Sequence, residues 1–330
     1  MAGPALSADA IAARIDTLCK PPGSLGRLED VAARLAMIQQ TLAPVTRPRR
    51  CVVFAADHGV TAAGVSAWPS EVTAGVVGVM ARRKTASGVF AAALDCESVV
   101  VDVGLLRPVK QSGVADAAVR RGTADLSVGD AMTADEFAAA VEVGREQARD
   151  AAECAVVIGG EMGIGNTTPA SCLVAAFTGQ PAETVVGLGA GLPAADRDHK
   201  VEVVRDAVAR VDGLDAAAIG AGVGGLEIAA LAGFLMQAAE QRQTVLLDGF
   251  IATAAALLAE RLAPGTAASM IAGHRSVEPG HRAALAALGL DPVLDLGLRL
   301  GEATGALAAL PLLDLAAAML TMATLDEVES

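Results

Sequence analysis

The stretch that decides the fold runs from Cys154 to Pro169 and reads CAVVIGGEMGIGNTTP. Its first part is a short, continuous apolar run, which is typical of a strand buried on both faces of a sheet. Glycines then predict a loop. Thr168 is expected to cap the helix that follows, with Pro169 at its first position. The stretch therefore predicts a strand, a glycine-rich loop and a helix in succession.

Similar apolar, β-branched runs recur along the chain, and each ends at a glycine or an acid. The other runs are Cys51–Ala55, Ser98–Val103, Thr184–Val186, Thr244–Leu247 and Ser269–Ala272. Alanine-rich segments with helical periodicity lie between them. Strands that alternate with helices predict an α/β fold, a doubly wound and mainly parallel Rossmann-like sheet covered on both faces.

The two ends of the chain differ from this pattern. Ala5–Leu42 and Pro311–Leu325 have helical character without an intervening strand, and Pro21-Pro22-Gly23 separates two helices in the first segment. We expect residues 1–45 and 306–330 to form a small helical subdomain. Residues 46–305 then form the Rossmann-like catalytic domain.

Composition excludes several classes of protein. The net charge of −13 argues against a nucleic-acid partner, because a phosphate backbone requires a basic surface. No apolar run is long enough to predict a membrane span, and the first ten residues lack the pattern of a secretory signal. The five cysteines are scattered and none forms C-x-x-C, which favours a reduced, cytoplasmic protein.

Polar and glycine residues cluster where the predicted strands end. The segments are Asp57–Gly59, Asp102–Gly104, Gly159–Glu161, Gly187–Gly189, Asp248–Gly249 and Gly273–His274. Ligands of open parallel sheets bind beyond the carboxyl ends of the strands, so this clustering favours a catalytic crevice there. The alternative is that glycine and aspartate only terminate the strands.

The glycine-rich loop after Ile158 is a candidate phosphate or sugar site, because the start of a helix presents free N–H groups to an anion. A plain strand–turn–helix connection is the alternative. Gly220–Gly225 matches G-x-G-x-x-G, but the preceding residues do not resemble a strand, so a dinucleotide site is not indicated. A phosphate loop before a helix at Leu226 stays open. Lys200 suits a phosphate or a solvated helix face equally.

Glu302 lies between Gly301 and Gly305 in apolar sequence. It could be a partly desolvated base, or an acid at a helix N-terminus. The four histidines show no metal-ligand spacing, so neither a metal nor a cofactor is expected. G-x-S-x-G is absent, which argues against a serine hydrolase.

Taken together, the loops resemble one family, the nicotinate-nucleotide–dimethylbenzimidazole phosphoribosyltransferases. The matching motifs are Lys20–Glu29, Ala56–Val60, Gly160–Gly163, Asn166–Pro169, Gly224–Glu227, Leu247–Phe250, Gly273–Ser276 and Arg299–Glu302. The resemblance implies transfer of ribose 5-phosphate from nicotinate mononucleotide to a benzimidazole nitrogen. The products are nicotinate and α-ribazole 5′-phosphate, made for the nucleotide loop of cobalamin. It also implies a Rossmann-like domain, a small helical domain and a homodimer.

The resemblance further assigns expected roles to residues. Glu302 would take the proton from the base, and Glu161 would stabilise an oxocarbenium-like transition state or bind a ribose hydroxyl. Nicotinate leaves with a negative charge, so no metal is required. The residues expected to hold the phosphate and ribose are Gly160, Gly163, Asn166, Thr167, Thr168, Gly187, Gly189, Gly191, Lys200, Gly224 and Gly225.

The stretch Gly64–Gly75 resembles the family's base-binding segment, with Leu300 on the same site. Ser66, Trp68 and Gly75 are its expected base-binding residues, but many relatives carry Tyr in place of Trp68 and Gln in place of Gly75. The change removes two hydrogen-bonding groups and keeps an aromatic face. The acceptor is therefore left open among dimethylbenzimidazole, another benzimidazole and other azoles.

Two other functions remain as alternatives. A nucleotide-dependent oxidoreductase on the same sheet would bind NAD(P) at Gly220–Gly225. A non-catalytic binding protein of cobamide metabolism would have no use for Glu302, which is present.

Overall fold

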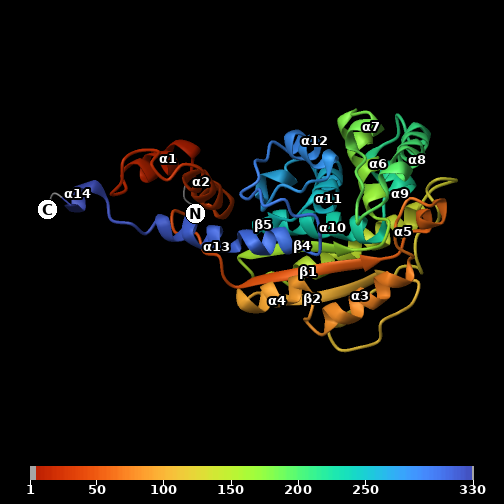
Figure 1. Ribbon diagram of the computed structural model, residues 1–330. Coiled ribbons are helices and arrows are strands. Elements are labelled where there is room, and N and C mark those ends of the chain that lie inside the picture. Colours follow the sequence, from red (N-terminus) through yellow and green to blue (C-terminus); the bar gives the residue numbers. More distant parts are fainter. Residues whose placement is uncertain (1–4, 329–330) are drawn as a thin grey trace.

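Six parallel strands form one sheet through the centre of the molecule (Figure 1). The computed structural model describes residues 5–328. The strands are β1 (Arg49–Ala56), β2 (Glu97–Gly104), β3 (Val114–Asp116), β4 (Val156–Met162), β5 (Thr244–Leu247) and β6 (Met270–Ala272). Their order is β3-β2-β1-β4-β5-β6, so the winding reverses between β1 and β4. The predicted doubly wound parallel sheet is confirmed, and a crevice is expected where the winding reverses.

Helices cover both faces of this sheet, and those at the two ends of the chain extend beyond it (Figure 1). They are α1 (Ala8–Asp16), α2 (Arg27–Gln39), α3 (Glu71–Ala81), α4 (Ala86–Ala93), α5 (Ala134–Arg149), α6 (Thr167–Thr178), α7 (Ala182–Val185), α8 (Arg197–Arg210), α9 (Ala216–Val223), α10 (Leu226–Glu240), α11 (Phe250–Leu262), α12 (Pro279–Leu288), α13 (Thr304–Met319) and α14 (Leu325–Val328). No helix in residues 5–328 combines the length and apolar character needed to cross a membrane.

The alternation of side chains along β1 shows how the sheet separates two cores. Val52, Phe54 and Ala56 pack in the core that includes α5, α6 and α8–α12. Their neighbours Cys51 and Val53 point to the other face, into the core that includes α1–α4 and α13. Successive residues of a strand face opposite sides, and both sides are apolar here, as a parallel sheet requires.

Helices α5 and α10 lie very close together because glycines face the backbone of the other helix. A Cβ on Gly144 would lie 1.7 Å from the Ala230 oxygen, and one on Gly233 would lie 2.0 Å from the Val141 oxygen. Such contacts fix the two helices at a distance that no other residue would permit.

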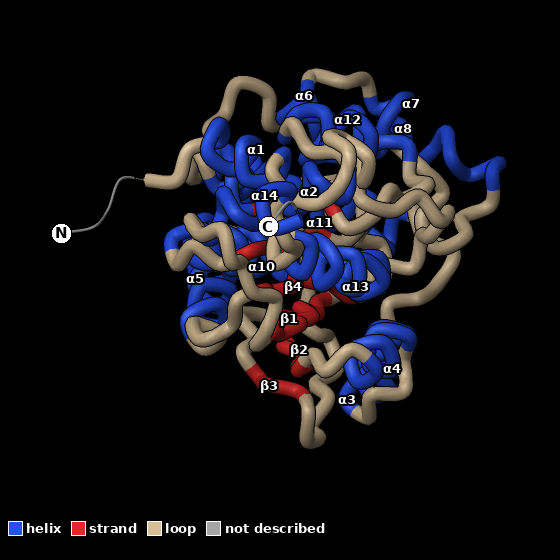
Figure 2. The backbone as a smooth tube through the Cα atoms, turned by 90° about the vertical axis from the view of Figure 1, so that its left-hand side faces the viewer, coloured by secondary structure: helices blue, strands red, loops and turns tan. Residues whose placement is uncertain are grey.

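Helices from the two ends of the chain lie on the same face of the sheet and beside each other (Figures 1 and 2). A short antiparallel bridge joins Leu18 to Thr324, and the Arg14 guanidinium donates to the Leu320 and Met322 carbonyls. These contacts support a common subdomain of residues 1–45 and 306–330, whose boundaries stay a prediction. Residues 1–4 and 329–330 of that proposed subdomain lie outside the described residues.

The predicted strand at Thr184–Val186 is wrong. Thr184 lies in the short helix α7, where its hydroxyl donates to the Pro181 carbonyl, and Val186 follows the helix in an extended conformation. The sheet instead gains the edge strand β3, which the sequence analysis missed. Its three residues pair only with β2 and carry too little apolar sequence to be recognised.

The helix boundaries near the glycine-rich loop also differ from the prediction. Gly159, Gly160 and Glu161 lie within β4 rather than after it. Helix α6 begins at Thr167 with Asn166 as its N-cap residue, so Thr168 does not cap it.

The start of the last long helix was also misplaced. It begins at Thr304 and continues through Pro311, where the prediction had placed its first residue. The proline removes one backbone donor, but the apolar face of α13 is buried along its length.

Candidate active site

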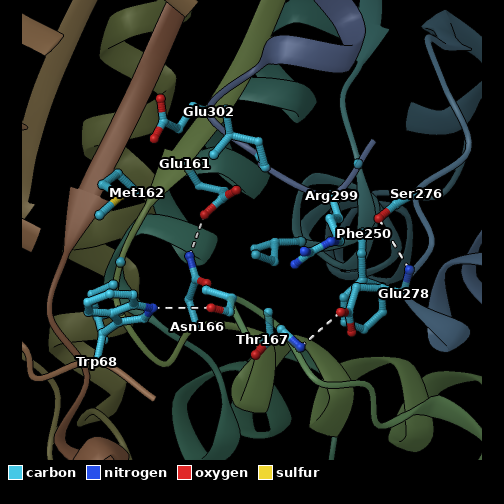
Figure 3. A pocket seen from close by; sticks show the side chains of 18 of the residues that line it. Trp68, Glu161, Met162, Asn166, Thr167, Phe250, Ser276, Glu278, Arg299 and Glu302 are labelled. Carbon is cyan, nitrogen blue, oxygen red and sulfur yellow. Dashed lines mark hydrogen bonds between the residues drawn. The ribbon is translucent and has the colours of Figure 1, made fainter. Parts of the chain in front are cut away.

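A cavity of about 280 Å³ lies at the carboxyl ends of β4, β5 and β6 (Figure 3). It is lined by Trp68, Val72, Glu161, Met162, Gly163, Ile164, Asn166, Thr167, Gly189, Ala190, Gly249, Phe250, Ile251, His274, Ser276, Glu278, Arg299, Leu300, Gly301 and Glu302. Its position is the one that parallel open sheets use for ligands. Most of its wall is apolar, with a few polar groups that converge on the interior, as small-molecule sites require.

Glu161, near the end of β4, is the most deeply buried acid of the cavity wall. Its side chain accepts a hydrogen bond from the Asn166 amide (Figure 3). Burial raises the pKa of Glu161 to about 8, with further contributions from the charges of Glu227 and Asp248, while Asn166 lowers it. At neutral pH this side chain is therefore mainly protonated, and it can donate a hydrogen bond to a ligand.

Glu302 sits at one end of the cavity, beyond Glu161 (Figure 3), and is 8% exposed. Burial raises its pKa to about 7, and the charge of Asp248 adds to the rise. A hydrogen bond from the Ser87 hydroxyl of α4 opposes it. The second carboxylate oxygen, Oε2, is buried without a hydrogen-bond partner. A carboxylate with these properties is suited to accept a proton from a weakly acidic ligand N–H near pH 7.

The backbone around Glu302 forms an unusual turn. Gly301, Glu302 and Ala303 have φ values of 82°, 59° and 66°, a left-handed conformation that disfavours residues with a Cβ. The turn is also crowded, because a Cβ on Gly301 would lie 2.5 Å from Glu161 Oε1. A Cβ on Gly160 of β4 would lie 2.9 Å from the Ala303 Cβ. Glycines in this turn and in the strand beneath it therefore bring Glu302 and Glu161 together.

Trp68 and Leu300 are exposed apolar side chains on the cavity wall, 53% and 58% exposed. The Trp68 indole N–H donates to the Ala190 carbonyl at 3.1 Å, which fixes the ring against the loop of residues 187–191 (Figure 3). Ser66 holds the same turn through hydrogen bonds with the Trp68 backbone. The indole thus presents a fixed aromatic surface to a planar ligand.

Lys200 of α8 lies behind the cavity wall rather than on it. Its ammonium donates to the Thr167 hydroxyl at 2.8 Å, and Thr167 itself lines the cavity. Burial lowers the pKa of Lys200 to about 8, while the negative charge of Glu278 acts to raise it. The Glu278 carboxylate also accepts the Gly189 N–H at 2.9 Å. A buried cation, the start of α6 and a glycine loop thus meet on one side of the cavity.

The structure brings about half of the predicted site residues to the cavity. Those that line it are Trp68, Glu161, Gly163, Asn166, Thr167, Gly189, Leu300 and Glu302. Gly160, Thr168, Gly187 and Lys200 lie close behind the wall, where they contact its residues or adjoin them in sequence. Ser66 lines a small adjoining cavity.

Four predicted residues stand apart from the wall. Gly75 lies in α3 and faces open space, and Gly191 is exposed with nothing near the position of a Cβ. Gly224 and Gly225 connect α9 to α10, where Gly225 adjoins the buried hydrogen bond between His58 and Glu227. The first part of the G-x-G-x-x-G match lies within α9, so no strand leads into it.

Five residues of the site received no role from the sequence: Asp248, His274, Ser276, Glu278 and Arg299. Asp248 and His274 stand at predicted strand ends, and Ser276 and Arg299 lie in family motifs, so a weak signal existed for these four. Glu278 had no such signal, and it reaches the cavity wall from the loop after β6. Among the described residues, no three His, Cys, Asp or Glu side chains are arranged to hold a metal ion.

Comparisons with known proteins match this chain over nearly its whole length. Residues 4–329 match a family model described as Phosphoribosyltransferase. A nicotinate-nucleotide–dimethylbenzimidazole phosphoribosyltransferase of Thermus thermophilus is 48% identical, with 95% of each chain covered. One from Mycobacterium marinum is 47% identical, covering 98% of this chain and 92% of the relative.

The fold also matches that of a solved structure. The crystal structure of CobT from Thermus thermophilus superposes with a TM-score of 0.95 at 46% identity, and the superposition covers 98% of both chains. Sequence identity at this level over nearly full-length chains establishes both the fold and the family. The chain belongs to the family of nicotinate-nucleotide–dimethylbenzimidazole phosphoribosyltransferases.

Proposed function

We propose that this protein transfers the phosphoribosyl group of nicotinate mononucleotide to 5,6-dimethylbenzimidazole or a related base. Nicotinate and α-ribazole 5′-phosphate would be the products, made for the nucleotide loop of cobalamin. The observation that carries the proposal is Glu302, a buried carboxylate with a pKa of about 7 and an unpaired oxygen beside an apolar cavity. Family membership supports the same reaction.

In this reaction Glu302 accepts the N–H proton of the benzimidazole, and the other ring nitrogen attacks the anomeric carbon of the donor. An ordinary glutamate is a weaker base, so the raised pKa of Glu302 favours proton transfer at neutral pH. Attack opposite the departing nicotinate inverts that carbon from β to α. In this structure the Ser87 hydroxyl lies close enough to the carboxylate to lower its pKa, so a change of Glu302 rotamer toward the base is part of the proposal.

Glu161 is assigned to the ribose. Of the two roles considered for it, a pKa of about 8 favours hydrogen bonding to a ribose hydroxyl as the neutral acid. A neutral acid adds little electrostatic stabilisation to a positively charged transition state. Asn166 would orient Glu161 through its amide and leave the acid proton for the sugar.

The phosphate would bind on the side of the cavity where Thr167, Gly189 and Lys200 meet. In the first turn of α6, the Thr168 and Ala170 N–H groups are already bonded within the chain and Pro169 has none, so the Thr167 N–H is the donor left for a phosphate. Lys200 supplies a positive charge through the Thr167 hydroxyl. Glycines 163, 187 and 191 are proposed to shape this side. Gly160, Thr168, Gly224 and Gly225 would act on the ribose and phosphate only through the loops that they support.

Arg299 lines the cavity, and no Lys or other Arg of the described residues does. The donor carries a carboxylate on its nicotinate ring as well as a phosphate. We therefore assign Arg299 to the negative charge of the donor.

The acceptor would lie against Trp68 and Leu300, with Ser66 supporting the Trp68 turn. Apart from Glu302, this part of the wall offers an aromatic and aliphatic surface, including Met162 and Ile164. A purine such as adenine would leave its exocyclic amine without a partner there, which costs binding free energy. A benzimidazole fits better. Gly75 leaves open space at the family's base-binding helix rather than a further contact.

A homodimer and a cytoplasmic location complete the proposal. Exposed apolar side chains at the cavity mouth, such as Trp68 and Leu300, support a partner surface there. All five cysteines are free, which agrees with a reducing compartment. Sedimentation equilibrium would test the dimer.

Incubation with nicotinate mononucleotide and dimethylbenzimidazole, followed by mass detection of ribazole phosphate, tests the function. The reaction is expected to proceed without added metal or cofactor. An equimolar mixture of dimethylbenzimidazole, benzimidazole and adenine would identify the acceptor class. Absence of any ribazole product, or a strong preference for adenine, would contradict the proposal.

A further inference from the structure

We propose that Asp248 is the positioning residue of this active site: its buried carboxylate holds the left-handed turn that carries Glu302 and sets the charge that Glu302 faces. The inference rests on the proposed role of Glu302 as the base. Asp248 does not contribute to the cavity wall, so it would act through Glu302 and not on the substrate.

The hydrogen bonds of Asp248 converge on the residues that follow Glu302. One carboxylate oxygen accepts the backbone N–H groups of Gly305 and Ala306, at 2.7 and 3.0 Å. The other accepts the Ala303 N–H at 3.1 Å. These are donors of the first turn of α13, which the helix itself cannot satisfy. A negative charge at a helix N-terminus is also favourable. Asp248 thus anchors the start of α13 to the end of β5.

The anchored turn is one that the chain would not adopt unaided. Glu302 and Ala303 both have positive φ values, 59° and 66°, and each such residue costs about 1 kcal/mol or more. Ala303 has no side-chain hydrogen bond to cap α13. The Asp248 carboxylate supplies the missing cap from a distant part of the chain, and so offsets the strain.

Close packing on both sides also restricts the position of this turn. The turn lies over Gly160, where a Cβ would meet the Ala303 nitrogen at 2.9 Å. On its other side Gly305 abuts His274, where a Cβ would lie 1.8 Å from the ring. The His274 ring in turn lies 3.7 Å from Asp248. The turn is therefore held between β4, the end of β6 and Asp248.

Asp248 also acts on Glu302 through its charge. It contributes to the raised pKa of Glu302 and to that of Glu161. The other groups that face this region are Glu161 of β4, Ser87 from α4 and His274 after β6. Removing the charge of Asp248 should therefore lower the pKa of Glu302 toward that of an ordinary glutamate, which makes it a weaker base.

The test is Asp248→Asn, with transfer measured as kcat/KM against pH. Asparagine keeps one oxygen acceptor but presents an NH₂ group to one of the backbone donors, so the turn loosens. We expect kcat to fall roughly 10- to 100-fold, as for loss of a hydrogen bond to a charged group, with little change in the KM for the donor. The acidic midpoint of the profile, near 7 in the wild type, should move to lower pH.

Asp102→Asn is the matched control. Asp102 is a buried carboxylate near the end of β2, two strands away from β4, that accepts hydrogen bonds from the Leu105 N–H at 2.7 Å and the Arg121 guanidinium at 3.1 Å. Its replacement should lower the melting temperature without moving the acidic midpoint. A shift of the midpoint in this control would show that general loosening of the fold mimics the predicted effect, and would overturn the inference.

A second variant guards against failure of Asp248→Asn to fold. Asp248→Asn combined with Ala303→Gly places glycine at a left-handed position, where it is unstrained. We expect the double variant to fold and to recover part of the turnover. Its acidic midpoint should stay low, because the charge is still absent. Loss of the turnover with no such recovery would contradict the positioning role.

Carbon NMR of ¹³C-glutamate-labelled protein separates this inference from the proposed function. The Glu302 signal, assigned by its loss in Glu302→Gln, should titrate at lower pH in Asp248→Asn whether or not the enzyme makes ribazole phosphate. An unchanged Glu302 titration together with an unchanged pH profile would overturn the inference. A wild-type enzyme that makes no product, with the predicted NMR shift present, would instead contradict the proposed function alone.

Discussion

Replacing Glu161 with Gln should change the free energy of unfolding relative to the wild type in a pH-dependent way. The difference should favour the variant more at alkaline pH than at acid pH. The pKa of Glu161 is raised to about 8 in the folded state, chiefly by burial, from 4.5. Between these two values the folded state binds more protons than the unfolded state, so wild-type stability falls as pH rises through this window. Glutamine has no proton to lose and is free of this loss.

The size of the effect follows from linkage. The gain of the variant should grow by at most about 1.4 kcal/mol per pH unit between pH 4.5 and 8, and then level off. Because the Glu161 site is coupled to neighbouring acids, we expect a total difference of about 2–4 kcal/mol between pH 5 and pH 8.5. Urea unfolding of both proteins at pH 5, 6.5 and 8.5, with equal m values, measures it.

Glu29→Gln provides a control of opposite sign. Its hydrogen bond with Lys20 lowers the pKa of Glu29, so that side chain stabilises the fold above its unfolded pKa. This contribution is lost as pH falls. Glu29→Gln should therefore lower the free energy of unfolding at neutral pH but not at acid pH. A Glu161→Gln difference that is constant from pH 5 to pH 8.5 would refute the reasoning about Glu161.

The same variant tests the role of Glu161 in the reaction. An amide still donates a hydrogen bond, so a ribose-binding neutral acid predicts turnover within about tenfold of the wild type at pH 7. A carboxylate that stabilises the transition state predicts a loss of two or more orders of magnitude. Single-turnover rates with saturating donor distinguish the two.

Three further changes are predicted. Ser87→Ala removes the hydrogen bond that lowers the pKa of Glu302, so the acidic midpoint of kcat/KM should rise above the wild-type value. Arg299→Gln should weaken binding of nicotinate mononucleotide about tenfold, as measured by calorimetry, because a charge-assisted contact is lost. Gly144→Ala forces a Cβ to 1.7 Å from the Ala230 oxygen, which should cost at least about 2 kcal/mol in urea unfolding.

Arg299→Gln and Gly144→Ala each have a control variant. Arg107→Gln removes an exposed arginine beside Glu71 and should leave donor binding unchanged. Gly78→Ala adds a Cβ in α3 with only the end of Arg82 nearby, and should stabilise the protein by about 0.5–1 kcal/mol. If Gly144→Ala matched Gly78→Ala in stability, the close packing of α5 and α10 would be wrong. An acidic midpoint that falls in Ser87→Ala would contradict the hydrogen bond to Glu302.

The sheet was predictable because its strands are buried on both faces. The run Val156–Ile158 is continuous and β-branched, and glycine follows it, a combination that few helices share. Prediction from local sequence failed for short segments. Thr184–Val186 has the residues of a strand, but Pro181 and the hydroxyl of Thr184 favour a helical turn instead. Strand β3 is extended because it pairs with β2, and no local sequence pattern predicts it.

The site was predictable only in part, because its geometry depends on contacts between distant segments. Sequence alone left Glu302 between a base and an acid at a helix N-terminus. Both descriptions prove relevant, since Glu302 precedes α13 and its burial raises its pKa. Asp248 was visible only as an acid at a strand end. Its hydrogen bonds to residues more than 50 positions later depend on the tertiary fold.

Trp68 illustrates the same limit. The sequence indicated an aromatic surface for the base, but the indole N–H reaches Ala190, 122 residues away. This contact links the proposed base side of the cavity to the proposed phosphate side. No spacing rule predicts such a bond, because it depends on where two loops of the sheet meet.

The most direct test of the account is the turnover of Glu302→Gln with nicotinate mononucleotide and dimethylbenzimidazole. Glutamine preserves the shape of the side chain and removes the base. We expect kcat to fall by several orders of magnitude at pH 7.5, while calorimetry shows donor binding within about threefold of the wild type. Near-normal turnover in this variant, with the donor bound as before, would show that another group activates the acceptor and would contradict the account.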